Sequence, residues 1–415
     1  MSAHPLPRRI ARSLRARLGE VRASPLLSAA ALRERRHARG GFPVSEPHAP
    51  HLEGALAWLE RAQDATGPDG GIARGYSMRW NPYFRGAGWQ PAYPETTGYT
   101  IPTLLSAARG GARDGLRARA LRAAAWEIAV QLPGGAVQGG VIGEAPAPAV
   151  FNTGQVVLGW LAALEERGDG AFADAARRAC GWLAGAERDG RFVRGESRRA
   201  RPDATAYNAR AAWAVAEAGA LLGEPRFTGS AARVLRRVAA AQHEDGWFPD
   251  CCLNDPAHPL LHTLVYTARG LVEGGRVLGD AALVEAGARA AAALAERLDA
   301  RGRLPGRLGP GWASAAAWGC LTGEAQLANL WLRLDEMEGA RTRAEPVARV
   351  LRRLKATQDL EAPDPGMRGG IPGSWPPGGP YGEWEMLSWA AKFFADALMR
   401  DDAAAGRGAP VSRLA

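Results

Sequence analysis

The sequence predicts an all-α protein, an (α/α)6 barrel or toroid of six helical hairpins. Three observations lead to this fold class. A Gly-rich turn recurs six times along the 415 residues, each time after an apolar helical run. A second helix with a polar start and a small, apolar body follows each turn. Segments in which apolar and polar residues alternate, as in half-buried strands, are nearly absent.

The first helix of each hairpin ends at one of the recurring turns, because Gly lets the chain leave helical geometry. These first helices are richer in Arg and Glu, as in residues 116–130, so we expect them on the outside of the ring. The glycines that mark the six turns are Gly70, Gly139, Gly190, Gly246, Gly302 and Gly369.

The second helices consist mainly of small apolar residues, so we expect them inside the ring, packed on both sides. They are predicted at residues 95–108, 152–164, 204–222, 262–278, 321–334 and 387–399. The last hairpin is as apolar as the internal ones, and no polar capping repeat is visible at either end, which favours a closed ring over an open solenoid. In a closed ring the N-terminal ends of the inner helices gather at one mouth.

The predicted organisation is a disordered basic arm (1–45), the toroid (46–402) and a flexible tail (403–415). The net charge of +9 is concentrated in the arm, because residues 1–40 hold ten arginines and two glutamates. The rest of the chain is nearly neutral, so we expect the folded part not to bind nucleic acid. The arm is expected to be a solvated tail or a weak contact to an anionic surface.

No segment has the pattern of a targeting or membrane sequence. The arm lacks the continuous apolar region of a signal peptide, and no stretch of about 18 apolar residues occurs. The four cysteines have no CxxC spacing and are expected to be buried, reduced thiols; they are Cys180, Cys251, Cys252 and Cys320. We therefore expect a cytoplasmic protein without a transmembrane segment, a metal or a cofactor.

Two turn regions, residues 62–72 and 241–248, resemble the repeat of prenyltransferases and squalene cyclases. The order of parts is similar to that of six-hairpin sugar-active proteins: polysaccharide lyases, glucuronyl C5-epimerases and acylglucosamine 2-epimerases. The whole pattern over about residues 50–400, including YPETTGY and FNTGQVVLGW, is similar to a polysaccharide-biosynthesis family often labelled prenyltransferase-like. The resemblance implies a toroid fold and a carbohydrate substrate in exopolysaccharide assembly or turnover.

Isoprenoid chemistry is a weaker alternative for the same fold. The Asp-x-Asp-Asp acid of protonation-type cyclases is absent, and the one Asp-Asp pair, Asp401–Asp402, lies beyond the last predicted helix. Asp-rich helices that would hold magnesium and pyrophosphate are absent too. A zinc site from Asp250, Cys251 and His262 is disfavoured, because adjacent Cys251 and Cys252 point in different directions.

The rim of the mouth is rich in aromatic and hydrogen-bonding side chains, which suit sugars because pyranose faces stack on rings and hydroxyls bind polar groups. Helix N-termini also favour an anionic sugar such as a uronate. The predicted substrate-binding residues are Trp80, Trp89, Tyr93, Thr96, Asn152, Gln155, Asn208, Arg210, Trp247, Arg269 and Trp375.

Glu95 is the first candidate for acid–base chemistry. It follows an aromatic, proline-stiffened approach that includes Trp89 and Tyr93, so burial would raise its pKa. Alternatively it is an exposed first-turn carboxylate that balances the helix dipole. Asp203 is a second candidate carboxylate or else the N-cap of the third inner helix. Two carboxylates across a cleft would allow glycoside hydrolysis.

His262 is the second candidate, because it opens an inner helix and is followed by Tyr266 and Arg269 on the same helix face. This set suits proton abstraction next to a carboxylate: Arg holds the acid while His or Tyr moves the proton. Tyr207 with Arg210 would form a second such set, and the resemblance to lyases implies that Asn152 neutralises the uronate carboxylate. The alternative for each residue is a capping or core contact.

Three functions remain open at this point. The first is a carbohydrate-active enzyme, a lyase, epimerase or hydrolase acting on an acidic polysaccharide or oligosaccharide, with Glu95, His262, Tyr207, Asp203 and Tyr266 as catalytic residues. The second is a toroid that only binds glycan or a protein partner. The third is an isoprenoid-handling toroid, which would need an apolar cavity without polar groups.

Overall fold

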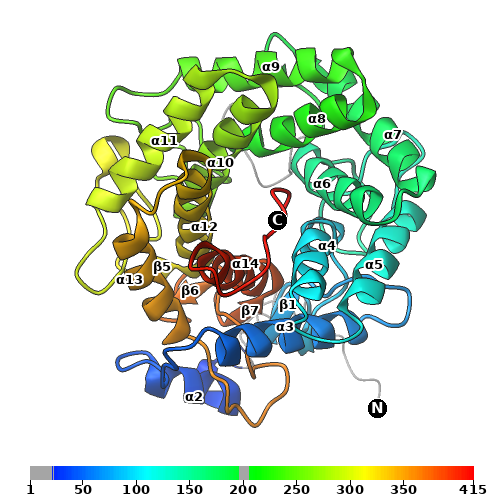
Figure 1. Ribbon diagram of the computed structural model, residues 1–415. Helices are drawn as coiled ribbons and strands as arrows, with labels where there is room; N and C mark the ends of the chain where they lie inside the picture. The colour runs from blue at the N-terminus through cyan, green and yellow to red at the C-terminus, as the bar shows by residue number, and fades with distance from the viewer. Residues whose placement is uncertain (1–20, 22, 196–204) are drawn as a thin grey trace, which may run out of the picture.

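The computed structural model describes residues 21, 23–195 and 205–415. Six inner helices form a closed ring, and six outer helices surround it (Figure 1), so the predicted (α/α)6 toroid is confirmed. The inner helices are α4 (Pro94–Arg109), α6 (Val150–Arg167), α8 (Ala209–Leu222), α10 (Leu261–Leu278), α12 (Leu321–Glu338) and α14 (Ser388–Ala404). The outer helices are α3 (Ala49–Asp64), α5 (Leu116–Val130), α7 (Gly170–Ala186), α9 (Pro225–Ala240), α11 (Ala281–Glu296) and α13 (Ala344–Lys355).

The inner helices are buried along most of their length, whereas the outer helices bury one stripe. Every residue of α6 from 150 to 163 is buried, but α9 buries only five side chains. Small residues bring the inner helices close together: a Cβ at Gly159 of α6 would lie 2.3 Å from the carbonyl oxygen of Gly98 in α4. The small, apolar composition of the inner helices is therefore explained by contacts on both of their sides.

The six recurring turns have one geometry. The glycine of each turn has a positive φ, and a Cβ there would lie 2.3 to 3.2 Å from a backbone atom of the next outer helix around the ring. In the second unit this glycine is Gly135 and not Gly139, because the chain continues for several residues before α6 begins. The six glycines are Gly70, Gly135, Gly190, Gly246, Gly302 and Gly369.

A glutamine before four of these turns joins the turn to the next outer helix. In the fourth unit Gln242 donates through Nε2 to the carbonyl of Gly246 and to that of Ala286 in α11, both at 2.9 Å. The equivalent glutamines of the other three units are Gln63, Gln131 and Gln358. In the third unit Glu187 replaces the glutamine and accepts from Gly190 N and from Arg233 of α9. The Gln-to-Gly pattern that resembles prenyltransferase repeats is thus a structural link between hairpins.

Replacing Gly135 with Ala is expected to destabilise the protein by about 2–5 kcal/mol. A non-Gly residue at positive φ costs about 1–2 kcal/mol, and overpacking adds about 1–3 kcal/mol. The overpacking arises because the new Cβ would lie 2.5 Å from the carbonyl oxygen of Arg178 in α7. Gly143, with φ of +96° and nothing within 4 Å of its Cβ position, is the matched control. Urea unfolding of both variants checks this, and equal losses would show that the contact with α7 is unimportant.

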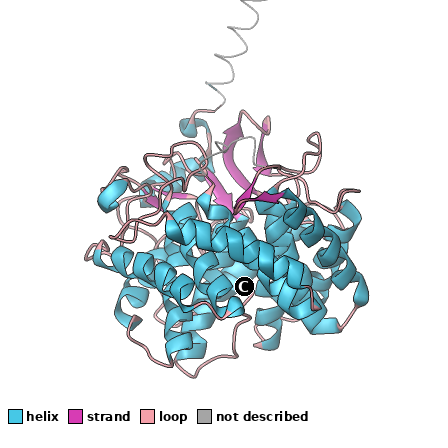
Figure 2. Ribbon diagram, turned by 90° about the horizontal axis from the view of Figure 1, so that it is seen from above, coloured by secondary structure: helices cyan, strands magenta, loops and turns pink. Residues whose placement is uncertain are grey.

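Short strands, which the sequence did not predict, gather at one end of the ring (Figure 2). A three-stranded antiparallel sheet has the order β2 (Gly86–Trp89), β1 (Gly75–Asn81), β7 (Glu385–Leu387). The other pairs are β3 (Glu187–Arg188) with β4 (Arg191–Phe192), and β5 (Gly319–Cys320) with β6 (Ser374–Trp375). These strands have at most seven residues, too few for a clear alternating pattern. The pairing of β1 with β7 joins the first and last units of the ring.

The described part of the N-terminal arm is folded, which corrects the predicted boundary at residue 45. Residues 25–45 include the short helix η1 (Pro25–Leu27) and α2 (Ala29–His37). Ala31 and Phe42 are buried against the ring, and Arg33 forms an ion pair with Asp359. The four basic residues of α2 and the absence of an apolar stripe gave no sign in the sequence that this helix packs on the ring. The predicted disorder of residues 1–20 lies outside the described residues.

The segment expected to be a flexible tail, residues 403–415, instead packs inside the ring. The helix α14 continues to Ala404, and the chain then turns back towards the centre of the ring (Figure 1). Leu414 is fully buried, and Arg413 forms ion pairs with Glu165 at 2.5 Å and Glu217 at 3.3 Å. The two glutamates lie on inner helices that are distant in the sequence from the C-terminal segment, so composition alone did not indicate these contacts.

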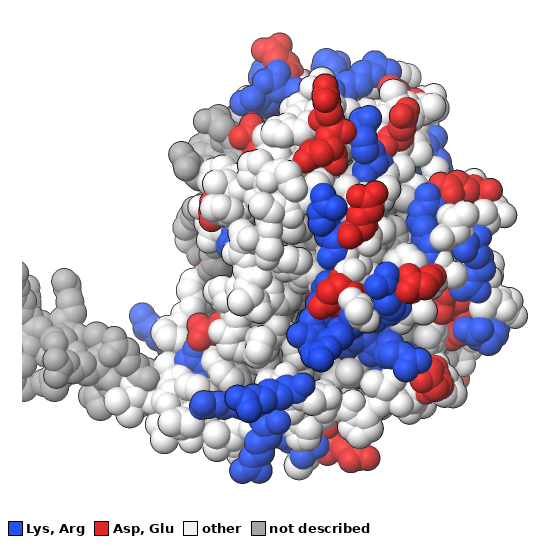
Figure 3. Space-filling model, turned by 90° about the vertical axis from the view of Figure 1, so that its left-hand side faces the viewer, with Lys and Arg blue, Asp and Glu red and all other residues white. Residues whose placement is uncertain are grey.

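The outer surface carries both signs of charge. Basic and acidic side chains are interspersed on the side of the ring shown in Figure 3, as the near-neutral composition of the folded part predicts. Among the described helices, none is long and apolar enough to cross a membrane. All four cysteines are buried and free, as predicted.

Candidate active site

A cavity of about 560 Å³ lies at the mouth of the ring where the inner helices begin. Its floor comes from the first turns of α4, α6, α10 and α14 and from the short helix η2 (Ala206–Asn208) that precedes α8. The β1–β2 hairpin and the loops near residues 254, 307 and 380–385 form its walls. The predicted gathering of inner-helix starts at one mouth is therefore observed.

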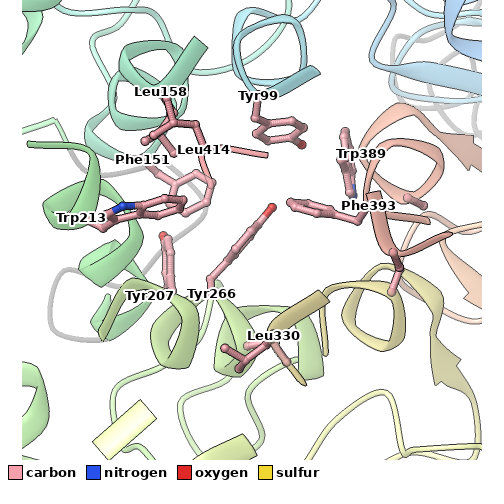
Figure 4. Packing of buried hydrophobic residues seen from close by; sticks show 14 of the residues in the cluster. Tyr99, Phe151, Leu158, Tyr207, Trp213, Tyr266, Leu330, Trp389, Phe393 and Leu414 are labelled. Atoms are coloured by element: carbon pink, nitrogen blue, oxygen red, sulfur yellow. The ribbon is translucent and has the colours of Figure 1, made fainter. Parts of the chain in front are cut away.

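Seven of the predicted site residues line this single cavity. From the catalytic set these are Glu95, Tyr207, His262 and Tyr266, and from the substrate-binding set Trp80, Tyr93 and Asn152. Asp203 lies outside the described residues. Tyr99, Tyr266 and Phe393 point towards one another from three inner helices (Figure 4), and Tyr266 also lines the cavity. The ring centroids of Phe151 and Tyr266 are 4.8 Å apart.

The prediction that the other eight substrate-binding residues lie at the cavity rim is wrong. Gln155, Arg210 and Arg269 lie one or two helical turns below the mouth: Arg210 donates to Gln155 at 2.7 Å, and Arg269 pairs with Glu273 at 2.9 Å. Thr96 and Asn208 are near helix starts but buried. The sequence places a residue near the start of a helix without showing which side chain faces the opening.

The three tryptophans of this set pack against other parts of the fold. Trp89 contacts Trp58 at a centroid distance of 5.1 Å, and Trp375 lies edge-on to Phe42 at 6.4 Å. Trp247 is buried beside His243, with a centroid distance of 5.0 Å. Their aromatic character is therefore explained by packing, and none of them lines the cavity.

Glu95 is held in the cavity by a chain of hydrogen bonds. Tyr93 donates through its hydroxyl to Glu95 Oε2 at 2.5 Å, and Asn152 donates through Nδ2 to the Tyr93 hydroxyl at 3.2 Å. Pro94 begins α4 with Tyr93 in an extended conformation, so Tyr93 and Glu95 can face the same side. Sequence reasoning selected all three residues but not their contacts.

Burial raises the pKa of Glu95 to about 7, although the Tyr93 hydroxyl and the guanidinium groups of Arg74 and Arg210 act in the opposite direction. A carboxylate that merely balanced a helix dipole at an exposed helix start would keep a low pKa. The environment of Glu95 is thus that of a group poised to exchange a proton near neutral pH.

A second carboxylate, Glu385 on β7, lines the same cavity and was not predicted. Its Oε2 accepts from Arg74 at 2.9 Å, and its Oε1 accepts from Asn81 at 2.7 Å and Gln90 at 2.8 Å. These three hydrogen bonds, one of them from a guanidinium group, hold the Glu385 side chain in place. The Arg74 guanidinium also lies 5.0 Å from the centroid of the Trp389 ring. Glu385 and Asn81 lie in short strands that sequence patterns missed, and Arg74 and Gln90 directly flank such strands.

His262 is enclosed by aromatic rings. It lies 5.0 Å from the ring of Tyr266 and 4.8 Å from that of Tyr381, and neither of its ring nitrogens has a hydrogen-bond partner among the described residues. Burial lowers its pKa to about 3, and the nearby Arg307 acts in the same direction. His262 is therefore neutral at pH 7 and a weak proton acceptor. The predicted stack of His262, Tyr266 and Arg269 does not form, because Arg269 turns to Glu273.

Two further arginines stand at the cavity walls. Arg79 pairs with Glu383 at 2.9 Å, and Arg307 donates to the carbonyl of His258 at 2.7 Å and to Asn254 at 3.1 Å. With Arg74 they give the cavity three guanidinium groups. For Arg79 the available sequence signal was the run of aromatic residues around it in YSMRWNPYF (76–84).

The zinc alternative is disfavoured by the surroundings of Cys251. Its thiol donates to the Thr263 carbonyl at 3.2 Å and lies 2.9 Å from the Thr267 hydroxyl. Within the described residues, no group of three or more His, Cys, Asp or Glu could hold a metal ion.

Comparison with protein families and with curated proteins finds no match. Comparison with solved structures finds toroids of similar length. An unsaturated glucuronyl hydrolase specific for heparin has a TM-score of 0.66 and 14% identity over 86% of this chain and 97% of that one. Cellobiose 2-epimerase from Bacillus thermoamylovorans has a TM-score of 0.65 and 10% identity over 89% and 98%. An α-amylase from Clostridium perfringens has a TM-score of 0.63 and 10% identity over 86% and 99%. At these identities the likeness shows that the chain has the α/α-toroid fold.

Proposed function

We propose that the protein is a carbohydrate-active enzyme of the hydrolase type, acting on an oligosaccharide or polysaccharide that contains an acidic sugar. The observation that carries the proposal is Glu95, a carboxyl group with a pKa of about 7 at the floor of an aromatic cavity. At neutral pH about half of such groups are protonated, so Glu95 can donate a proton to a glycosidic oxygen.

The proposed reaction needs only groups that face the cavity. Glu95 gives its proton to the leaving oxygen, the bond from that oxygen to the anomeric carbon breaks, and water adds to this carbon. The water gives up a proton that restores the Glu95 carboxyl group. The side chain of Glu385, which lines the same cavity, stabilises the positive charge that develops on the sugar ring during bond cleavage.

The cavity walls support a charged sugar as ligand. Tyr207, Tyr266 and Trp389 offer ring faces and edges for pyranose units. Arg79 and Arg307 at the walls offer guanidinium groups to a carboxylate or sulfate. The solved structures with this fold include an unsaturated glucuronyl hydrolase, which agrees with an acidic sugar. A place in exopolysaccharide assembly or turnover and a cytoplasmic location are part of this proposal.

Two observations favour hydrolysis over the proton abstraction of lyases and epimerases. His262, the predicted proton acceptor, is neutral with a pKa of about 3, so it would take up a proton poorly. Its predicted partner Arg269 points away from the cavity. The isoprenoid alternative is disfavoured because Glu95, Arg74, Glu385 and Asn152 give the cavity polar walls. A toroid that only binds glycan is the remaining alternative.

Incubation with a panel of uronate-containing and neutral polysaccharides tests the proposal. We expect release of reducing ends from an acidic member, with no unsaturated ends and no deuterium incorporation at C5. Unsaturated ends would assign the protein as a lyase, and deuterium at C5 as an epimerase. Glycan binding without any of the three readouts would show that the toroid only binds sugars.

A further inference from the structure

A second cavity of about 250 Å³ lies beside the first and shares walls with it. Arg74, Tyr93 and Asn152 line both cavities, so the side chains that hold Glu95 also separate the two spaces. The rest of the side cavity comes from residues 139–149, the loop before α6, which contributes mainly small residues.

The tip of the β1–β2 hairpin forms part of the wall of the side cavity. Tyr83 at this tip lines both cavities and donates through its hydroxyl to Glu144 in the loop before α6. Gly140 makes room for this contact, because a Cβ there would lie 2.3 Å from Glu144 Oε2. The Tyr83–Glu144 contact therefore connects the β1–β2 hairpin to the loop before α6 at the wall of the side cavity.

We propose that the side cavity is a second sugar-binding subsite. The substrate is then a sugar chain that has units in both cavities and passes the Tyr83–Glu144 contact. This inference rests on the proposed function and extends it by placing neighbouring units of the sugar chain in two separate cavities. Its consequence is that the reaction rate depends on chain length, because short fragments fill only the main cavity.

The chemistry of the side cavity suits a pyranose unit. The rings of Tyr83 and Phe84 stand edge to face with centroids 4.9 Å apart, and both residues line the cavity. Tyr83 is 54% exposed, and an exposed aromatic ring is a surface on which a pyranose can stack. Glu144 and Asn152 offer hydrogen bonds to hydroxyl groups, while Gly139 and Ala147 leave space for the ring.

Filling the side cavity with a large side chain tests the inference. The variant is Ala147→Trp, and Ala145→Trp, at an exposed position of the same cavity, serves if the first fails to fold. Ala340→Trp, at an exposed position after α12, is the control for adding a tryptophan. The measured quantities are kcat/KM and Kd for a disaccharide and for an oligosaccharide of about six units, both prepared from the polysaccharide selected by the panel.

We expect the ratio of kcat/KM for the longer chain to that for the disaccharide to fall at least tenfold in the filled variant. An unchanged ratio, with turnover by the wild type, would overturn the side subsite and leave the proposed hydrolase intact. Absence of turnover, with binding of the longer chain that weakens at least tenfold in the filled variant, would overturn the hydrolase and support the subsite. Absence of binding by either chain would overturn the subsite.

Discussion

The substitution Glu95→Gln is expected to lower kcat by about two to four orders of magnitude while KM changes little. Gln keeps the shape of the side chain and can accept the hydrogen bond from Tyr93, but it has no acidic proton that it could transfer to a leaving oxygen. The loss therefore falls on the transition state and not on ground-state binding. Steady-state kinetics on the acidic polysaccharide selected by the panel measures both constants.

The variant Tyr93→Phe is the matched control for Glu95→Gln. It removes the hydroxyl that donates to Glu95 and keeps the carboxyl group itself. The Tyr93 hydroxyl lowers the pKa of Glu95, so its removal should raise this pKa above its wild-type value of about 7. We expect a smaller loss of kcat in Tyr93→Phe than in Glu95→Gln. Equal losses in both variants would mean that the proton of Glu95 is unimportant.

The substitution Asp396→Asn is expected to reduce the free energy of unfolding by about 3–5 kcal/mol. Asp396 on α14 is fully buried and pairs with Lys392, also fully buried, at 2.6 Å. Its negative charge also acts on the buried guanidinium groups of Arg210 and Arg400. The substitution removes the negative charge of Asp396. The buried cations around it, at the centre of the ring, then lose the carboxylate that stabilises them. Chemical denaturation of both proteins at one pH measures the loss.

The loss in Asp396→Asn should be larger at pH 6 than at pH 9. Burial lowers the pKa of Lys392 to about 7 in the wild type, with Asp396 acting in the opposite direction. Without Asp396 this pKa falls further, so only the variant must deprotonate Lys392 on folding when the pH is below 7. The double variant Lys392→Met, Asp396→Asn should recover part of the stability and lose this pH dependence. A loss that is independent of pH would contradict the account.

The fold was predictable because each repeat needs the same residue types at the same positions of its turn. Each turn glycine packs on the backbone of the next outer helix, and Gln63, Gln131, Gln242 and Gln358 make the same two hydrogen bonds. Such constraints appear in a single sequence as a Gln and Gly pattern that recurs along the chain. The ends of the chain were not predictable in this way, because α2 and Leu414 pack on units that are distant in the sequence.

The candidate site was predictable where it depends on helix starts. Glu95, Asn152 and His262 open inner helices, and a closed ring brings such positions together. Glu385 was missed because it lies in a short strand, β7, whose partner β1 comes from the opposite end of the chain, and Arg74 because it directly precedes β1. Arg210 and Arg269 were misplaced because helical spacing shows which residues share a face but not how deep below the mouth they lie.

The pH dependence of kcat/KM on the acidic polysaccharide tests the central claim most directly, because it reports the pKa of the catalytic group in the free enzyme. Glu95 must be protonated to act as the acid, so kcat/KM should stay constant below about pH 6 and fall as the pH rises through about 7. The same falling limb should move to higher pH in Tyr93→Phe. A profile of kcat/KM that does not fall near pH 7 would contradict the assignment of Glu95 as the proton donor. A fall near pH 7 that is unchanged in Tyr93→Phe and persists in Glu95→Gln would contradict it too.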